Sequence, residues 1–452
     1  MFLERNSIMS EQLKAPETAV DTAGTDVSFI KEKVKERPVN RKKLLRRTVI
    51  TASMAVIFGL IACFTFLVLE PVFSNWLYPE EEPEQIQLQE ELVSEEMHPE
   101  DMMLEEEKPQ FSAPQFITST VVQRVDMEVG DFQKLYRELY TVVQQASKSM
   151  VTVIGVTSET DWFNNAYESK GQTAGVIVAD NGMELLILTE KKIVDSAELL
   201  RVSFADNAQA PAVLKQADPV TGLAVVSVNL SDLSDFTLKS IAAARLGSTT
   251  NKSMLLASPI IAIGQPMGVS NSVAYGMISS MGSVLNLVDG NYQLIGTDIY
   301  GSLDGSGVLL NLNGQVLGII SQENSREDTP NTITALGISN LKNNIEKLSN
   351  GQPMAVLGIY GTDVPAEIQE TQGVPQGAYV TGIEMDSPAM ESGIQSGDVI
   401  VRIGTENITS FTKYNDIIMS LSPDTMVTLT VMRQTQNGYQ EMTVDVVLGM
   451  LK

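Results

Sequence analysis

The chain has 452 residues, a length that accommodates two or three domains, each with its own core. Its net charge of −25 at pH 7, with no basic cluster after residue 47, argues against nucleic acid as a partner. Its single cysteine, Cys63, excludes intrachain disulfides and cysteine-based metal sites, and no motif indicates a metal or another cofactor.

The N-terminal region has the charge pattern of a membrane anchor. Residues 1–47 are predicted to be a disordered, basic cytoplasmic tail, because nine Lys or Arg and two Glu lie between Lys31 and Arg47. Residues 48–69 follow with no charge, and a helix of this length spans about 33 Å, enough to cross a hydrocarbon core of about 30 Å. We therefore predict one transmembrane helix, with the N-terminus cytoplasmic and the bulk of a single-pass cell-membrane protein extracytoplasmic. A cleaved signal peptide is the alternative, but it normally lies nearer the N-terminus and has a shorter apolar run.

Residues 70–127 are predicted to be an acidic extracytoplasmic linker. Thirteen Asp or Glu residues lie between positions 79 and 107. Like charges repel one another and extend a chain, so the pattern favours a solvated spacer. A site for calcium or a cationic partner is the alternative interpretation.

Residues 128–347 are predicted to form a mainly β domain. It begins with an amphipathic helix near Asp131, whose apolar residues Phe132, Leu135, Leu139 and Val142 recur at helical spacing. Short β-branched runs such as "AGVIVAD", "ELLILTE" and "LAVVSVNL" follow, divided by turn residues, which favours a sandwich or barrel over alternating βα units. The run "ISNLKNNIEKLSNG" is typical of a helix that stops at a glycine.

Residues 352–452 are predicted to form a second compact domain. In "DSPAMESGIQSGDVIVRIG", Ser387 can cap a short helix and Pro388 suits its first position. A strand over Val399–Ile403, a helix near Thr412–Leu421 and two alternating strands follow.

These two domains, over about residues 128–452, resemble the HtrA (Do/DegS-like) family, which has a trypsin-like double β-barrel followed by a PDZ domain. The first half is similar to the family through "AGVIVADNGMELLILTEKKIV", "VSFADNAQAPAVLKQADPVTGLAVVSV", "IIAIGQPMGVSNSVAYGMISSMG" and "TDIYGSLDGSGVLLNLNGQVLGII". The second half is similar through "VLGI", "GAYV" and "SPAMESGIQSGDVI". The resemblance implies a mainly β fold of these two domains, preceded here by the predicted transmembrane helix.

The catalytic positions implied by the resemblance are not filled as the family pattern requires. Ser306 lies at the nucleophile position, but Lys192 replaces the histidine and Gly222 replaces the aspartate. Asp304 lies in the turn that forms the oxyanion hole, and the loop is one residue shorter than the family's. The sole histidine, His98, lies in the predicted linker, so the globular part has no Ser-His-Asp triad. The sequence therefore predicts a pseudoprotease.

An active endopeptidase of the HtrA type is the alternative. Serine and lysine pairs catalyse acyl transfer, so Lys192 could act as the base for Ser306 if burial kept its amine neutral. The polar neighbours Glu190, Lys191 and Asp195 argue for a wet setting instead.

The PDZ resemblance implies peptide binding. Leu357, Gly358 and Ile359 match the loop whose backbone N–H groups hold a C-terminal carboxylate, and the helix near residues 414–419 forms the other wall. We expect partners to be peptide C-termini or unfolded proteins of envelope quality control, in a homo-trimer or a mixed assembly with active relatives. A purely structural envelope protein is a third interpretation.

Overall fold

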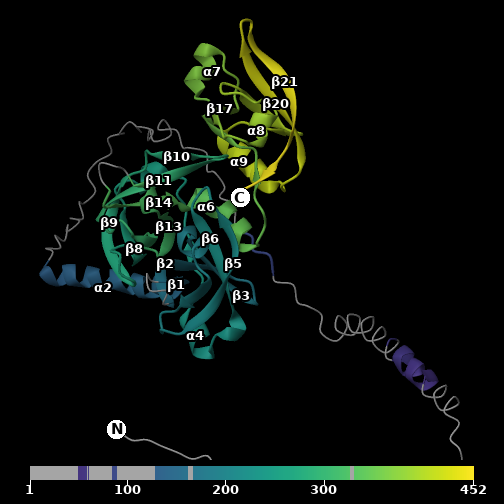
Figure 1. The fold of residues 1–452 in the computed structure, drawn as a ribbon. Helices are drawn as coiled ribbons and strands as arrows, with labels where there is room; N and C mark the ends of the chain where they lie inside the picture. Colours follow the sequence, from purple (N-terminus) through teal and green to yellow (C-terminus); the bar gives the residue numbers. More distant parts are fainter. Residues whose placement is uncertain are drawn as a thin grey trace, which may run out of the picture. The chain divides into compact units, whose positions relative to one another are not determined.

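The structure is a computed structural model that describes residues 49–58, 60, 84–88, 128–160, 166–325 and 330–451 (Figure 1). Of the predicted span 48–69, residues 49–58 and 60 are helical, and the remaining positions lie outside the described residues. Among the residues that are described, none of the helices is both long and apolar enough to cross a membrane. The predicted tail, His98 and most of the predicted linker also lie outside the described residues. The chain from Glu82 to Lys452 forms one compact unit.

The helix α2 (Val129–Ala146) opens the first domain. Glu128 precedes it and forms a reciprocal capping box with Asp131, which satisfies N–H groups in the first turn. Only part of the predicted apolar face is buried: Leu139 and Val142 pack against the core, whereas Phe132 and Leu135 are exposed.

Six antiparallel strands form a closed barrel in the order β1-β2-β3-β6-β5-β4. Their bounds are β1 (Met150–Thr160), β2 (Ala166–Asp180), β3 (Glu184–Glu190), β4 (Leu199–Ser203), β5 (Gln209–Asp218) and β6 (Leu223–Asn229). Alternating β-branched and leucine side chains, among them Val153, Ile187 and Val226, fill its interior.

The following strands form a second sheet in the order β10-β11-β14-β13-β12-β8-β9, and an additional pairing of β9 with β11 closes a ring. The bounds are β7 (Arg245–Leu246), β8 (Pro259–Gln265), β9 (Ser272–Ser280), β10 (Val284–Leu287), β11 (Gly290–Tyr300), β12 (Ser306–Leu310), β13 (Gln315–Ile320) and β14 (Thr332–Gly337). The open choice between sandwich and barrel is thus settled in favour of two barrels, because β4 pairs with β1 in the first sheet and β9 pairs with β11 in the second.

Short helices connect these strands, and one longer helix ends the domain. The short ones are η2 (Ser147–Ser149), α3 (Lys191–Asp195), η3 (Leu230–Asp232), α4 (Asp235–Ser240), α5 (Lys252–Leu255) and η4 (Gln322–Asn324). The predicted final helix is α6 (Ile338–Ser349), which buries Leu341, Ile345 and Leu348 in the core. Residues 84–88 of the predicted linker lie along α6, where the Ile86 N–H donates to Asn350 Oδ1 at 3.1 Å and the Leu88 N–H to Glu346 Oε2 at 3.1 Å.

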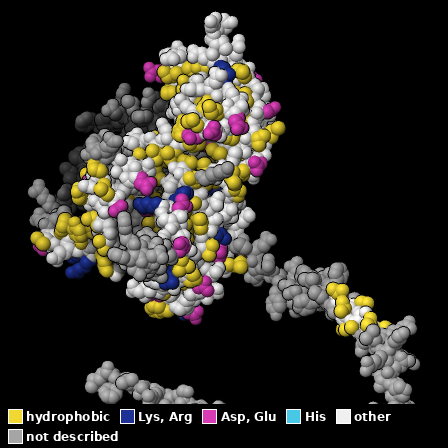
Figure 2. All heavy atoms as spheres, viewed as in Figure 1, with side chains coloured by type: hydrophobic (Ala, Val, Ile, Leu, Met, Phe, Trp, Pro, Cys, Tyr) yellow, Lys and Arg dark blue, Asp and Glu magenta, His cyan; other side chains and the backbone are white. Residues whose placement is uncertain are grey.

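The second domain is a sheet in the order β16-β17-β18-β20-β21, with β19 beside β18 and a separate β15–β22 pair. The bounds are β15 (Ala355–Val356), β16 (Ile359–Asp363), α7 (Ala366–Gln372), β17 (Ala378–Ile383), α8 (Pro388–Glu391), β18 (Val399–Ile403), β19 (Glu406–Asn407), α9 (Phe411–Ser420), β20 (Met426–Thr435), β21 (Gly438–Val447) and β22 (Gly449–Met450). Ser387 caps α8 as predicted, because its hydroxyl accepts a hydrogen bond from the Met390 N–H at 3.3 Å. Figure 2 shows Asp and Glu side chains scattered over both domains, in keeping with the net charge.

Candidate functional site

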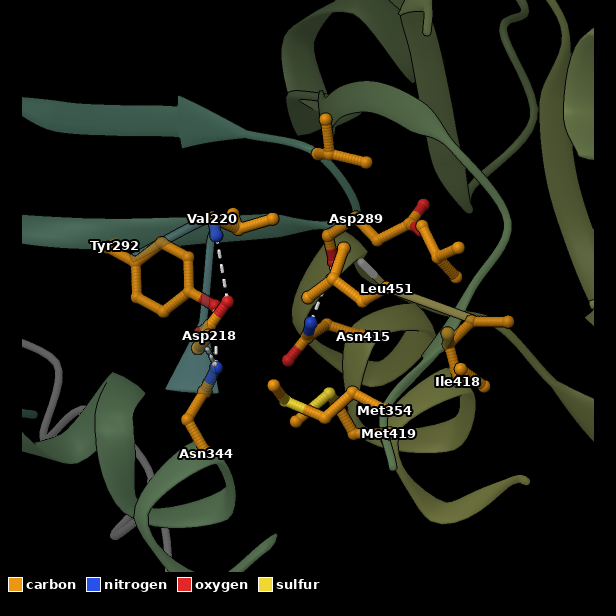
Figure 3. Close-up of a pocket in the computed structure, with 13 residues that line it drawn as sticks. Asp218, Val220, Asp289, Tyr292, Asn344, Met354, Asn415, Ile418, Met419 and Leu451 are labelled. Atoms are coloured by element: carbon orange, nitrogen blue, oxygen red, sulfur yellow. Dashed lines mark hydrogen bonds between the residues drawn. The ribbon is translucent and has the colours of Figure 1, made fainter. Parts of the chain in front are cut away.

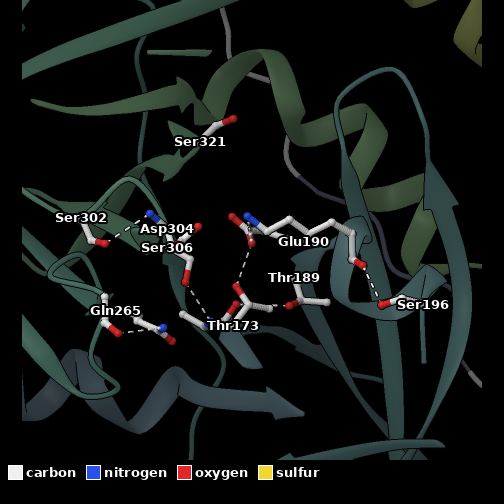
Figure 4. Close-up of polar contacts among 12 residues, drawn as sticks. Thr173, Thr189, Glu190, Ser196, Gln265, Ser302, Asp304, Ser306 and Ser321 are labelled. Atoms are coloured by element: carbon white, nitrogen blue, oxygen red, sulfur yellow. Dashed lines mark hydrogen bonds and ion pairs between the residues drawn. The ribbon is translucent and has the colours of Figure 1, made fainter. Parts of the chain in front are cut away.

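Ser306 begins β12 and points into the protein. Its side chain is buried, with 1% of its surface exposed, and its Oγ accepts a hydrogen bond from the Ala174 N–H of β2 at 3.0 Å (Figure 4). The hydroxyl therefore joins a strand of the second barrel to a strand of the first. A nucleophile must contact a substrate carbonyl, and in this position Ser306 does not reach the surface.

Two glycines fix the backbone at Ser306. Gly307 has a φ of +123°, and a Cβ there would lie 2.1 Å from the Ile263 carbonyl oxygen. Its pairing partner Gly264 has a φ of +112°, and a Cβ on it would lie 2.9 Å from the Gly307 Cα. Side chains are excluded from both positions, so β8 and β12 approach closely and Ser306 is held in place.

The N–H groups ahead of Ser306 already have partners. The Asp304 N–H donates to the Ser302 hydroxyl at 3.2 Å, and the Gly305 N–H donates to the Ser302 carbonyl oxygen at 2.9 Å. An oxyanion hole needs N–H groups that are aimed at a developing charge. These donors are aimed into their own turn, and the Asp304 side chain is exposed rather than inward.

Lys192 lies on α3, directly after β3. Its Nζ is 3.2 Å from Glu190 Oε2, and its side chain is 44% exposed. Glu190 Oε2 also accepts a hydrogen bond from Thr173 Oγ1 at 3.0 Å. A lysine that serves as a base needs a dry pocket without a carboxylate partner, and Lys192 has neither condition here.

Gly222 lies in a turn that a buried aspartate organises. Its φ of +70° suits glycine, and its N–H donates to the Asp218 carbonyl oxygen at 3.0 Å. The Asp218 carboxylate accepts hydrogen bonds from the Thr221 hydroxyl at 2.6 Å and from Asn344 Nδ2 at 2.9 Å. The carboxylate nearest to the predicted acid position in sequence thus holds the turn and is 1% exposed.

A cleft of about 270 Å³ brings the Lys192 and Gly222 positions together but leaves Ser306 out. It is lined by Glu190, Lys191, Lys192, Asp195, Thr221, Gly222, Leu223, Ile320, Ser321 and Glu323. Two ion pairs lie among the lining residues: Lys191 pairs with Asp195, and Lys192 with Glu190. The arrangement can bind polar groups, but it offers no nucleophile paired with a base.

The loop of the second domain that the sequence predicts to bind a carboxylate connects β15 to β16, and it binds one in the structure. The N–H groups of Leu357 and Gly358 donate to Asp289 Oδ2 at 2.7 and 2.9 Å, and the Ile359 N–H donates to Asp289 Oδ1 at 3.0 Å. Gly358 has a φ of +92°, which turns its N–H toward the same point as its neighbours'.

Asp289 belongs to the turn between β10 and β11 of the first domain. It is 6% exposed, and the Tyr414 hydroxyl of α9 also donates to its Oδ1. Burial raises the pKa of the Asp289 carboxyl above its ordinary value of 3.8, although hydrogen bonds from Tyr414 and from the loop N–H groups oppose the rise. Burial likewise raises the pKa of Tyr414 well above 10.

Sequence reasoning missed Asp289 and Asp218. The run "LVDGNYQL" carries a hairpin signal, since Asp-Gly between alternating residues favours a tight turn. It carries no signal that the turn meets a loop 69 residues later. For Asp218, burial is the missing information, because a single carboxylate in a β-rich run looks like any exposed turn residue.

Comparison with known proteins identifies both domains. Residues 173–319 match the family model of a trypsin-like peptidase domain, and residues 336–446 match that of a PDZ domain. The expected trypsin-like and PDZ domains are therefore confirmed, in the order expected from the sequence.

Similar proteins are periplasmic serine endoproteases by name. The chain is 30% identical over 271 residues to the periplasmic serine endoprotease DegP of Escherichia coli K12, covering 58% of this chain and 54% of that protein. It is 28% identical over 287 residues to a probable periplasmic serine endoprotease of the DegP type from Halomonas elongata, covering 61% and 57%. The chain thus spans just over half the length of these relatives. The solved HtrA-type protease AlgW with a decapeptide shares the fold, with a TM-score of 0.50 at 21% identity over 69% of this chain and 98% of that one.

Proposed function

We propose that this chain, which combines a trypsin-like and a PDZ domain as HtrA/DegP proteins do, is a membrane-tethered peptide-binding pseudoprotease of extracytoplasmic protein quality control. The observation that carries the proposal is the convergence of three consecutive N–H groups, from Leu357 to Ile359, on one carboxylate. A peptide C-terminus presents the same chemical group, and the adjacent strand β16 can pair with an extended peptide. Peptide C-termini and the ends of unfolded proteins are the proposed partners.

Three features support an inactive trypsin-like domain. Ser306 is buried and bonded to the backbone of Ala174. The cleft beside Lys192 is not lined by Ser306, and the Lys192 ammonium is paired with Glu190. Catalysis by acyl transfer requires the nucleophile, base and oxyanion donors to face one point, and here they do not.

The tether and the compartment are proposed on separate grounds. The uncharged run from 48 to 69, with a basic flank on one side and an acidic one on the other, supports a single-pass anchor with a cytoplasmic N-terminus. The relatives that are named periplasmic support an extracytoplasmic position for the two domains.

An exposed aromatic cluster supports assembly into a homo-trimer or with active relatives. Phe132 and Tyr136 of α2 lie with ring centroids 5.1 Å apart, and Tyr136 meets Tyr275 of β9 edge-on at 5.8 Å. All three rings are substantially exposed, and large exposed apolar groups in a cluster are typical of protein interfaces.

An active endoprotease is the second candidate, which the names of the relatives favour. It requires the loop at residues 301–305 to move Ser306 out to the cleft and Lys192 to leave Glu190. Both candidates share the PDZ domain, so they differ only in what happens at Ser306.

Labelling separates the two candidates. The full-length chain is treated with a fluorophosphonate probe and with unfolded casein, alongside its Ser306→Ala variant and the Escherichia coli DegP relative as a positive control. We expect no labelling and no cleavage by this chain under conditions where the relative shows both. Cleavage that disappears in Ser306→Ala would establish the active endoprotease instead.

Peptide binding is tested on the same full-length chain. Peptides with free C-terminal carboxylates should bind, and the same peptides with C-terminal amides should bind much more weakly, because an amide cannot accept all the loop N–H bonds. Equal binding of both peptide sets would remove the carboxylate loop from the proposal.

A further inference from the structure

The turn at Asp289 occupies the PDZ loop as a peptide end would. Its side-chain carboxylate takes the three N–H groups of the loop, and its own backbone N–H donates to the Ile359 carbonyl oxygen at 2.8 Å. The next contact along the strand is made by Asn291, whose Nδ2 donates to the Gly361 carbonyl oxygen at 3.1 Å. A peptide that adds as a strand to the edge of a PDZ sheet binds in the same way, through its C-terminal carboxylate and through backbone hydrogen bonds.

The strand β16, which contacts the turn, is at the edge of its sheet. β16 is the first strand of its sheet and pairs with β17. On its other side stands α9, which reaches the turn through Asn415 Nδ2, a donor to the Asp289 carbonyl oxygen at 2.7 Å, and through the Tyr414 hydroxyl. The turn is therefore held from both walls of the peptide groove.

The space beside the turn is too small for a peptide side chain. A cavity of about 20 Å³ is lined by Asp289, by the α9 residues Asn415, Ile418 and Met419, and by Asp218, Tyr292 and Asn344 of the first domain (Figure 3). This is room for about one water molecule. Asp289 already accepts from the three loop N–H groups, so a peptide C-terminal carboxylate cannot bind to them while Asp289 is in place.

We propose that Asp289 is an internal ligand of the PDZ loop, and that a peptide C-terminus binds only by displacing it and releasing the PDZ domain from the β10–β11 hairpin. This inference rests on the proposed peptide-binding function. The two carboxylates need the same three N–H groups, so their binding is mutually exclusive. The affinity that an outside peptide shows is then the intrinsic affinity reduced by the fraction of molecules in which the loop is free.

The contact is suited to reversible exchange. The turn presents Asp289 at a φ of 55°, a left-handed conformation that aspartate adopts more readily than most residues. The docked carboxylate is removed from water, whereas in the released state it is solvated.

Because a bound peptide excludes Asp289 from the loop, binding of a peptide releases the PDZ domain from the hairpin. Peptide occupancy and the distance between the two domains should therefore change together.

The test uses the full-length chain with Asp289→Ala and Asp289→Asn. Asp424→Asn is the matched control, because Asp424 also has a positive φ of 61° but lies exposed in a PDZ-domain turn. The probe is an array of random decapeptides with free C-terminal carboxylates, and the amidated array is its control. Energy transfer between dyes at Lys239→Cys and Asn437→Cys, both exposed positions, with Cys63→Ser, reports the distance between the domains.

We expect both Asp289 variants to bind the free-carboxylate peptides at least about tenfold more tightly than the parent and Asp424→Asn, since a parent docked in about 90% of molecules gives that ratio. Energy transfer should fall in the Asp289 variants without peptide, and in the parent on addition of the free but not the amidated peptide. Equal affinity of parent and variants, with unchanged energy transfer, would overturn the inference while leaving peptide binding intact. Binding to neither parent nor variants would overturn the proposed function as well. Asp289→Asn keeps a turn-forming side chain, so it reports even if Asp289→Ala fails to fold.

Discussion

The backbone N–H of Ala174 donates a 3.0 Å hydrogen bond to the hydroxyl of Ser306, across a separation of 132 residues. The serine at the predicted nucleophile position is therefore a link between the two barrels. Its partner Ala174 is itself buried at 7% exposure, so the donor depends on this hydroxyl.

Replacing Ser306 by alanine should lower the free energy of unfolding. Under the proposed pseudoprotease function, it should leave the absence of casein cleavage unchanged. The change leaves the buried Ala174 N–H without its partner, which costs about 1–3 kcal/mol of the free energy of unfolding. Denaturant unfolding measures this loss of free energy. Ser302→Ala is the control, because the Ser302 hydroxyl accepts a hydrogen bond from the N–H of Asp304, which is exposed. Full stability of Ser306→Ala would contradict the structural role.

Gly358→Ala should abolish peptide binding and weaken docking. A Cβ at position 358 would lie 2.2 Å from the Ser387 Cβ, and the φ of +92° is strained for alanine, so the loop must shift. Strain of this kind costs about 1–3 kcal/mol. Gly373→Ala is the matched control, because Gly373 has a φ of +65° but open space around it. Isothermal titration with a free-carboxylate peptide distinguishes them, and equal binding by the two variants would count against the loop.

Tyr414→Phe should lower stability by removing one donor from a buried carboxylate. Hydrogen bonds to charged groups contribute about 1.5–3 kcal/mol, and Tyr414 is fully buried. Thermal unfolding of the variant should show this loss, whereas Tyr140→Phe at an exposed position should change stability by less than about 0.5 kcal/mol. Similar unfolding of both variants would mean that Asp289 does not depend on this hydroxyl.

Docking of the PDZ domain should strengthen as the pH falls. Burial raises the pKa of docked Asp289 above 3.8, so the docked state binds a proton more tightly than the released state. Protonation of Asp289 therefore stabilises the docked state fully below about pH 3.8. This stabilisation is lost as the pH rises through the raised pKa of docked Asp289, and above that pKa the docking equilibrium no longer depends on pH through Asp289.

The measurement is the difference in energy transfer between the parent and Asp289→Asn from about pH 4 to pH 8, since asparagine does not titrate in this range. Among the residues that the structure describes, the titratable groups that interact with Asp289 are Tyr414, Tyr292 and Tyr360, and the pKa of each is raised above 10, so all three stay neutral throughout. A parent and variant with parallel pH profiles would exclude Asp289 as the titrating group.

The sequence by itself determined the order of the two domains and their β-rich character. Short β-branched runs between turn residues and the cap at Ser387 act through local backbone preferences, which a linear pattern records. The trypsin-like and PDZ types of the domains came from the resemblance of their motifs to the HtrA family. The count of one histidine, at position 98, also needed no structure.

Only the tertiary structure decided what the key side chains face. Whether Ser306 points to a cleft or to Ala174 depends on the close approach of two strands at Gly264 and Gly307. Whether the PDZ loop is open or filled depends on Asp289, a turn residue of another domain. Burial and long-range hydrogen bonds arise from packing between distant segments. No local pattern therefore encodes the hydrogen bond between Ala174 and Ser306 or the one between Gly358 and Asp289.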